Sequence, residues 1–76
     1  MSEAHLSRSF KKTYGQTITD YIHEVRIFHA KELLSGTSAS IGSIALNVGY
    51  TDLNYFSRVF KAHTGLTPTA YRAKQV

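Results

Sequence analysis

The hydrophobic residues between positions 41 and 61 follow the spacing of two short helices separated by a tight turn. The positions that share one face of the first helix, at i, i+3, i+4 and i+7, are Ile41, Ile44, Ala45 and Val48. Ser40 precedes this run and is a favourable N-cap residue. Gly49 follows it, and glycine enters a left-handed turn without a steric penalty. The pattern therefore predicts a helix over 41–48 that ends at Gly49.

A second helix is predicted after this turn, with Thr51 or Asp52 as its N-cap. Its apolar side carries Leu53, Phe56 and Phe60, which can pack against the first helix. Polar side chains follow the same helical spacing on another face, and they are Asn54, Ser57, Arg58 and Lys61. Amide, hydroxyl and guanidinium groups suit base edges and phosphates, so the sequence predicts a nucleic-acid reader in a helix-turn-helix arrangement.

The beginning of the chain repeats this second helix. A shift of 50 residues aligns segment 7–21 with segment 57–71, and eight of the fifteen aligned positions are identical. The same shift aligns four residues of the first copy with the polar stripe of the second copy. These four residues are Ala4, Ser7, Arg8 and Lys11. Residues 1–16 are therefore predicted to contain the recognition helix of another helix-turn-helix unit.

A long helix is predicted between the two copies. In each copy a glycine, Gly15 or Gly65, ends the first helix, and a threonine two residues later, Thr17 or Thr67, can cap the next one. After Thr17 the apolar positions describe a helix of about 18 residues and roughly 27 Å, which ends at Gly36. Those positions are Ile18, Tyr21, Ile22, Val25, Ala30, Leu33 and Leu34.

The two units differ in length. The expected fold is all-α, with the first unit over 1–16, the connecting helix over 17–36, and the second unit with a C-terminal helix over 37–76. The second unit has a supporting helix before its outer helix, whereas the first unit begins almost at Met1. We therefore expect the missing support to lie upstream, in a longer protein that is cut here inside its first helix-turn-helix.

Composition narrows the class of protein. Nine Lys and Arg against five Asp and Glu give this 76-residue, single-domain chain a net charge of +4, which favours an anionic partner. The chain has no cysteine and no apolar run of the roughly 20 residues that a membrane span needs, so we expect a soluble cytoplasmic protein. A nucleophile elbow, a phosphate-cradling glycine loop and paired carboxylates in an apolar setting are all missing, which argues against an enzyme.

Several residues have a structural interpretation beside a functional one. The aromatic residues at helical spacing are expected in the core rather than stacked on bases, and they are Phe10, Tyr21, Phe56, Phe60 and Tyr71. Arg26 is expected to form a structural ion pair, or hydrogen bonds to helix ends, rather than to contact DNA. The four histidines lack the spacing of metal ligands, so neither a metal nor another cofactor is expected.

Four motifs stand at fixed spacings along the chain. They are RIFHAKELL at 26–34, Ile-Ala-x-x-Val-Gly-Tyr at 44–50, Tyr-Phe-Ser-Arg-x-Phe-Lys at 55–61 and Gly-x-Thr-Pro at 65–68. Together they closely resemble the arabinose-regulator (AraC/XylS) family of bacterial transcription regulators, and the resemblance covers nearly the whole chain. It implies two helix-turn-helix units joined by a long helix, whose recognition helices enter neighbouring major grooves on one face of the duplex.

In that family the base-reading positions lie on the outward stripes of the recognition helices. The resemblance implies base contacts from Ala4, Ser7 and Arg8 in the first unit and from Leu53, Asn54, Ser57 and Arg58 in the second. Phosphate contacts are expected from Lys11, Lys12, Ser40 and Lys61, with added backbone N–H donors at the helix starts near Ser2, Ser40 and Asp52. The alternative is a helical protein-interaction module that docks on an acidic partner such as RNA polymerase.

Overall fold

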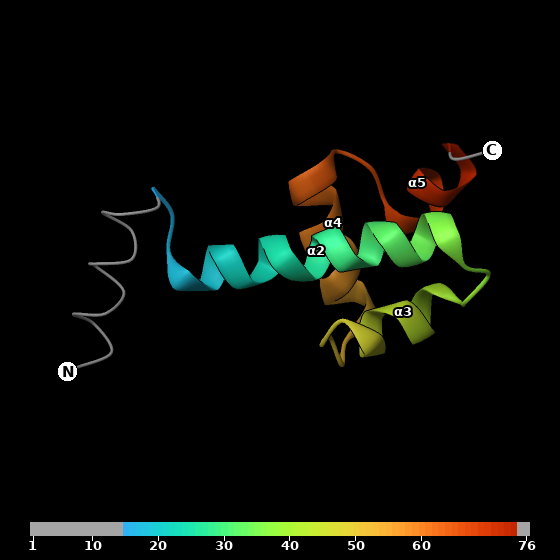
Figure 1. Ribbon diagram of the computed structural model, residues 1–76, viewed down its shortest axis with the longest axis horizontal. Helices are drawn as coiled ribbons and strands as arrows, with labels where there is room; N and C mark the ends of the chain where they lie inside the picture. The colour runs from blue at the N-terminus through green and yellow to red at the C-terminus, as the bar shows by residue number, and fades with distance from the viewer. Residues whose placement is uncertain (1–14, 75–76) are drawn as a thin grey trace.

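The computed structural model describes residues 15–74, which form four helices (Figure 1). Their bounds are Ile18–Gly36 for α2, Ile41–Asn47 for α3, Leu53–Thr64 for α4 and Pro68–Lys74 for α5. α2 is the long rod, and α3, α4 and α5 pack around its C-terminal part (Figure 1). Residues 15–74 contain no strand, so the all-α fold is confirmed for this part of the chain.

The stripe predicted for the first unit falls outside the described residues. Its members Ala4, Ser7, Arg8 and Lys11 precede residue 15, as do Lys12 and Phe10. The described residues comprise the connecting helix and the second helix-turn-helix unit.

Hydrogen bonds at both ends fix the extent of α2. Thr17 Oγ1 accepts from the backbone N–H of Asp20 at 3.0 Å, so the predicted cap is confirmed. At the other end Arg72 Nε, on α5, donates to the carbonyl of Leu34 at 3.3 Å, which ties α5 to the end of the rod. The 19 residues of α2 span about 28 Å at 1.5 Å per residue, in agreement with the predicted length.

The turn between α3 and α4 is tight because a glycine adopts the left-handed conformation there. Gly49 has a φ of +107°, and the backbone N–H of Tyr50 donates back to the carbonyl of Ala45 at 2.8 Å. Ser40 caps the start of α3 through its side chain, as the sequence predicted. The helix-turn-helix predicted from the hydrophobic spacing is therefore confirmed.

The core lies where α2, α3 and α4 meet. Its buried residues are Ile27, Ala30, Leu34, Ile44, Ala45, Tyr50, Phe56 and Phe60. Phe56 and Phe60 are fully buried, as predicted, and Tyr71 packs on Phe60 with the ring centroids 5.4 Å apart. Tyr21 is 44% exposed, so its assignment to the core is wrong. The described helices pack on a different face of α2 from the one that carries Tyr21.

α2 carries apolar side chains on two opposite faces. Ile27, Ala30 and Leu34 lie in the core. The large apolar residues that α2 leaves exposed are Tyr21, Ile22, Val25 and Phe28. At about 100° per residue these two sets lie roughly half a turn apart around the helix axis. The sequence analysis did not include Ile27 among the apolar positions of this helix, and periodicity alone does not show which of its faces will be covered.

Gly49→Ala is expected to destabilise the protein by more than the cost of backbone strain, because the added Cβ also crowds Arg26. An added Cβ would lie 3.0 Å from Arg26 Nε, and the φ of +107° already disfavours any L side chain. We expect the free energy of unfolding, measured by urea denaturation, to fall by about 2–3 kcal/mol.

Two matched substitutions separate the cost of backbone strain from the cost of the close contact with Arg26. Gly65 shares the left-handed backbone, at φ +81°, but a Cβ there meets no atom within 4 Å. Gly65→Ala is therefore expected to cost about 1 kcal/mol. Gly42 lies in α3 and also has open space around it, so Gly42→Ala is expected to stabilise by about 0.5 kcal/mol through helix propensity. Equal costs for Gly49→Ala and Gly65→Ala would contradict close packing of Arg26 on the turn.

Candidate nucleic-acid interface

The outward face of α4 presents polar side chains to solvent. Asn54, Arg58 and Lys61 are exposed, and Ser57 is half-buried. Within residues 15–74, no hydrogen bond or ion pair engages these four side chains. The predicted stripe thus lies outward, and its donors are available to an external ligand.

The opposite side of α4 anchors the helix. Phe56 and Phe60 are both 0% exposed, and their ring centroids lie 5.8 Å apart. Leu53 was predicted both on the apolar side and among the base readers, and the structure leaves it 46% exposed. Its side chain is therefore open to an external partner beside Asn54.

Side-chain caps occupy the starts of α3 and α4. Asp52 Oδ1 accepts from the backbone N–H groups of Asn54 at 2.9 Å and Tyr55 at 3.2 Å. These N–H groups were expected to be available to DNA phosphates, but the carboxylate takes them and adds a negative charge. Ser40 Oγ accepts from the backbone N–H of Ser43 at 3.1 Å. The exposed Ser40 hydroxyl keeps its own proton for donation to a phosphate.

Arg26 on α2 packs against the turn that precedes α4. Its guanidinium carbon lies 5.3 Å from the centroid of the Tyr50 ring, an arrangement that favours a cation. Arg26 therefore packs on an aromatic ring, and within residues 15–74 it makes neither the expected ion pair nor the expected hydrogen bond to a helix end. Burial raises the pKa of the Tyr50 hydroxyl, and the neighbouring Arg26 cation opposes part of that rise.

His23 also contacts Tyr50, and the sequence analysis did not single it out. Its Nδ1 lies 2.6 Å from the Tyr50 hydroxyl, and its Nε2 lies 3.4 Å from the Tyr55 hydroxyl. We call His23, Arg26, Tyr50 and Tyr55 the His23 cluster. His23 precedes Ile27 by one helical turn, and this spacing could have indicated that it faces the core.

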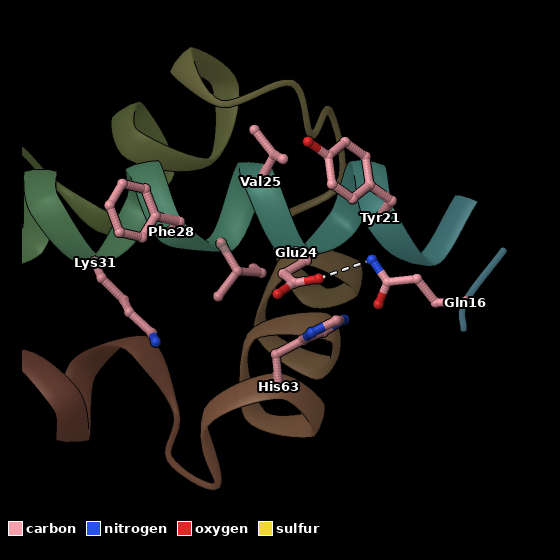
Figure 2. A pocket seen from close by; sticks show the side chains of 8 residues that line it. Gln16, Tyr21, Glu24, Val25, Phe28, Lys31 and His63 are labelled. Carbon is pink, nitrogen blue, oxygen red and sulfur yellow. Dashed lines mark hydrogen bonds between the residues drawn. The ribbon is translucent and has the colours of Figure 1, made fainter. Parts of the chain in front are cut away.

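A pocket lies beside α2 near the end of α4, away from the polar stripe (Figure 2). Its polar lining residues include Gln16, Glu24, Lys31 and His63, and Gln16 Nε2 donates to Glu24 Oε2 at 2.8 Å. Glu24 is the one carboxylate in this lining. Among residues 15–74 no group of three or more His, Asp or Glu could hold a metal ion. No helix in this range could cross a membrane.

Comparison with known proteins agrees with this geometry. A family model described as a helix-turn-helix domain matches residues 1–74. The bifunctional transcriptional activator/DNA repair enzyme AdaA of Bacillus subtilis is 44% identical over 71 residues, which are 93% of this chain and 34% of AdaA. The chain thus spans about a third of the length of that relative.

Two solved structures share the fold. A transcriptional regulator from Chromobacterium violaceum, of the AraC-type DNA-binding domain-containing proteins, aligns with a TM-score of 0.89 and 34% identity, covering 100% of this chain and 68% of that one. The DNA-binding domain of AdpA, a global transcriptional factor solved in complex with a target DNA, aligns with a TM-score of 0.90 and 26% identity, covering 97% and 67%. The helices described above therefore have the arrangement of domains of this type.

Above pH 10 the protein is expected to lose stability faster than its Tyr50→Phe variant. Burial raises the pKa of Tyr50 in the folded protein, so the unfolded chain ionises first, at the ordinary value of 10.0. The stability that depends on the neutral hydroxyl is fully present below that value, and it is lost as the pH rises through the folded-state pKa. Urea denaturation between about pH 8 and about pH 11 measures the difference, and parallel curves for the two proteins would contradict it.

Proposed function

Because the chain belongs to the AraC/XylS family of helix-turn-helix transcription regulators, we propose that it binds specific sequences in double-stranded DNA as the DNA-binding part of such a bacterial regulator. The observation that carries the proposal is the outward stripe of α4, whose amide, hydroxyl, guanidinium and ammonium groups have no partner within residues 15–74. An α-helix fits the major groove, where these groups can reach base edges. Regulators of this kind act on DNA in the cytoplasm.

Each base-reading side chain of α4 suits one feature of the duplex. The guanidinium of Arg58 can donate two hydrogen bonds to guanine O6 and N7, and the amide of Asn54 can pair with adenine N6 and N7. The exposed methyl groups of Leu53 suit a thymine methyl. Ser57 carries a hydroxyl that can donate to either kind of base. We propose these four residues as the base contacts of the second unit.

Phosphate contacts are proposed for Lys61 and Ser40. The Lys61 ammonium is exposed on α4, and the Ser40 hydroxyl retains a proton that it can donate. The Asp52 carboxylate at the start of α4 repels phosphates. The DNA backbone is therefore expected to pass closer to Ser40 and Lys61 than to Asp52.

We further propose that Ala4, Ser7 and Arg8 read a neighbouring major groove, with Lys11 and Lys12 on its phosphates. The sequence repeat supports this assignment because it aligns their stripe with that of α4. The rod length of about 28 Å is of the order of the roughly 34 Å between successive major grooves on one side of the duplex.

We propose no reaction, cofactor or small-molecule ligand for this domain. The repair activity in the name of AdaA belongs to that protein, of which this chain matches 34%. RNA polymerase is the other partner that the sequence favours, and the outward stripe is the basic surface that it would contact. DNA and polymerase would then compete for Arg58 and Lys61.

Arg58→Ala is expected to impair sequence reading. On a duplex selected from random sequences by the wild-type chain, we expect a loss of about 1–3 kcal/mol and a relaxed preference at one base pair. Lys61→Ala is expected to weaken binding to the selected and scrambled duplexes alike, and to lower the salt slope by about one. Fluorescence anisotropy titrations at several salt concentrations measure both effects.

Lys74→Ala is the matched control, because Lys74 is exposed on α5 and lies away from the stripe. We expect it to change neither affinity nor salt slope appreciably. Equal losses on the selected and scrambled duplexes for Arg58→Ala would contradict base reading. Undiminished DNA binding by both α4 variants, together with lost binding to polymerase, would favour the docking function instead.

A further inference from the structure

His23 connects three elements through a single imidazole ring. It projects from α2, its Nδ1 lies 2.6 Å from the hydroxyl of Tyr50 in the turn, and its Nε2 lies 3.4 Å from the hydroxyl of Tyr55 in the first turn of α4. Among residues 15–74, no other side chain of α2 hydrogen-bonds to both the turn and α4.

Aromatic packing fixes the plane of this imidazole. His23 stacks on Tyr50 with the centroids 5.7 Å apart and the planes 12° from parallel. It meets Tyr55 edge-on, at 6.0 Å and 69°. Tyr50 itself is 3% exposed. With the ring held on two sides, the directions of both nitrogens are fixed, and so are the positions of the hydroxyls that bond to them.

We propose that His23 is a positioning residue that sets the rotation of α4 about its own axis, and hence the direction of the Asn54 and Arg58 side chains. The inference rests on the proposed DNA-binding function. Tyr55 directly follows Asn54 and precedes Arg58 by three residues, so a constraint on Tyr55 is a constraint on the stripe.

Hydrogen bonds constrain the rotation of a helix about its axis more tightly than apolar packing does. Phe56 and Phe60 hold α4 in the core by shape, which tolerates small rotations, whereas a hydrogen bond weakens when its angle changes. A rotation of about 10° moves a side-chain end about 6 Å from the helix axis by about 1 Å. That displacement exceeds the roughly 0.5 Å tolerance of a recognition geometry.

Substitutions of His23 that keep only one of its two polar contacts can test this positioning role. A neutral imidazole donates from one nitrogen and accepts at the other, and a tyrosine hydroxyl can do either, so both tautomers satisfy both contacts. An asparagine amide can occupy the place of Nδ1, and a glutamine amide reaches nearer to the place of Nε2. Because the contact to Tyr55 is the one that reaches α4, His23→Gln is expected to restore more function than His23→Asn.

The variants His23→Phe, His23→Asn and His23→Gln are compared in the full 76-residue chain, at a temperature where circular dichroism shows each of them folded. His23→Phe keeps the ring and removes both nitrogens. It is expected to weaken binding to the selected duplex about tenfold and to the scrambled duplex less than about twofold. His23→Gln is expected to recover more of the selectivity than His23→Asn. His29→Phe is the matched control, because the side chain of His29 is 59% exposed on the same helix.

A second measurement needs no DNA. Residual dipolar couplings of the backbone amides report the rotation of α4 relative to α2, and we expect His23→Phe to change their phase along α4 and His23→Gln to restore it. Unchanged couplings in His23→Phe, or equal losses on both duplexes, would overturn the positioning role. A wild-type chain that binds both duplexes equally would contradict the proposed function instead, and the couplings would still decide the role of His23.

Discussion

The burial of Tyr50 between α2 and α4 is the contact on which the placement of the recognition helix depends. Its backbone N–H closes the turn onto Ala45 at 2.8 Å. Its ring meets the Arg26 guanidinium at 5.3 Å on the α2 side and Phe56 at 5.4 Å on the α4 side. A Cβ at Gly49 would lie 3.0 Å from Arg26 Nε, so a side chain there would displace the guanidinium from its place beside the turn. The ring of Tyr50 therefore packs on both the connecting helix and the second helix-turn-helix unit, and it anchors one to the other.

Backbone groups at both ends of α4 are hydrogen-bonded within the chain, while the outward face of the helix is open to solvent. Asp52 accepts from two backbone N–H groups at the start, and the N–H of Gly65 donates to Lys61 O at 2.8 Å at the end. Helix ends that are already bonded need no rearrangement when DNA arrives, which lowers the entropic cost of binding. The outward amide of Asn54 and guanidinium of Arg58 keep their hydrogen-bonding capacity for an external partner.

The sequence was sufficient for features that depend on local chemistry. Ser40 and Thr17 were recognisable caps, Gly49 marked the turn, and Phe56 and Phe60 repeated at the spacing of a buried face. Contacts between distant segments were harder to predict. Tyr21 was assigned to the core because periodicity shows that a helix has an apolar face but not which neighbour covers it. His23 and its tyrosine partners are 27 and 32 residues apart, and no local pattern joins them.

Intermolecular nuclear Overhauser effects between the chain and its selected duplex would show whether α4 lies in the major groove. The Leu53 methyl groups and the Asn54 and Arg58 side-chain protons are the reporters, since all three lie on the outward side of α4. We expect contacts from these protons to major-groove protons, namely thymine methyls and cytosine H5. Contacts confined to adenine H2 in the minor groove, or arising from Phe28 on α2 while α4 shows none, would contradict it.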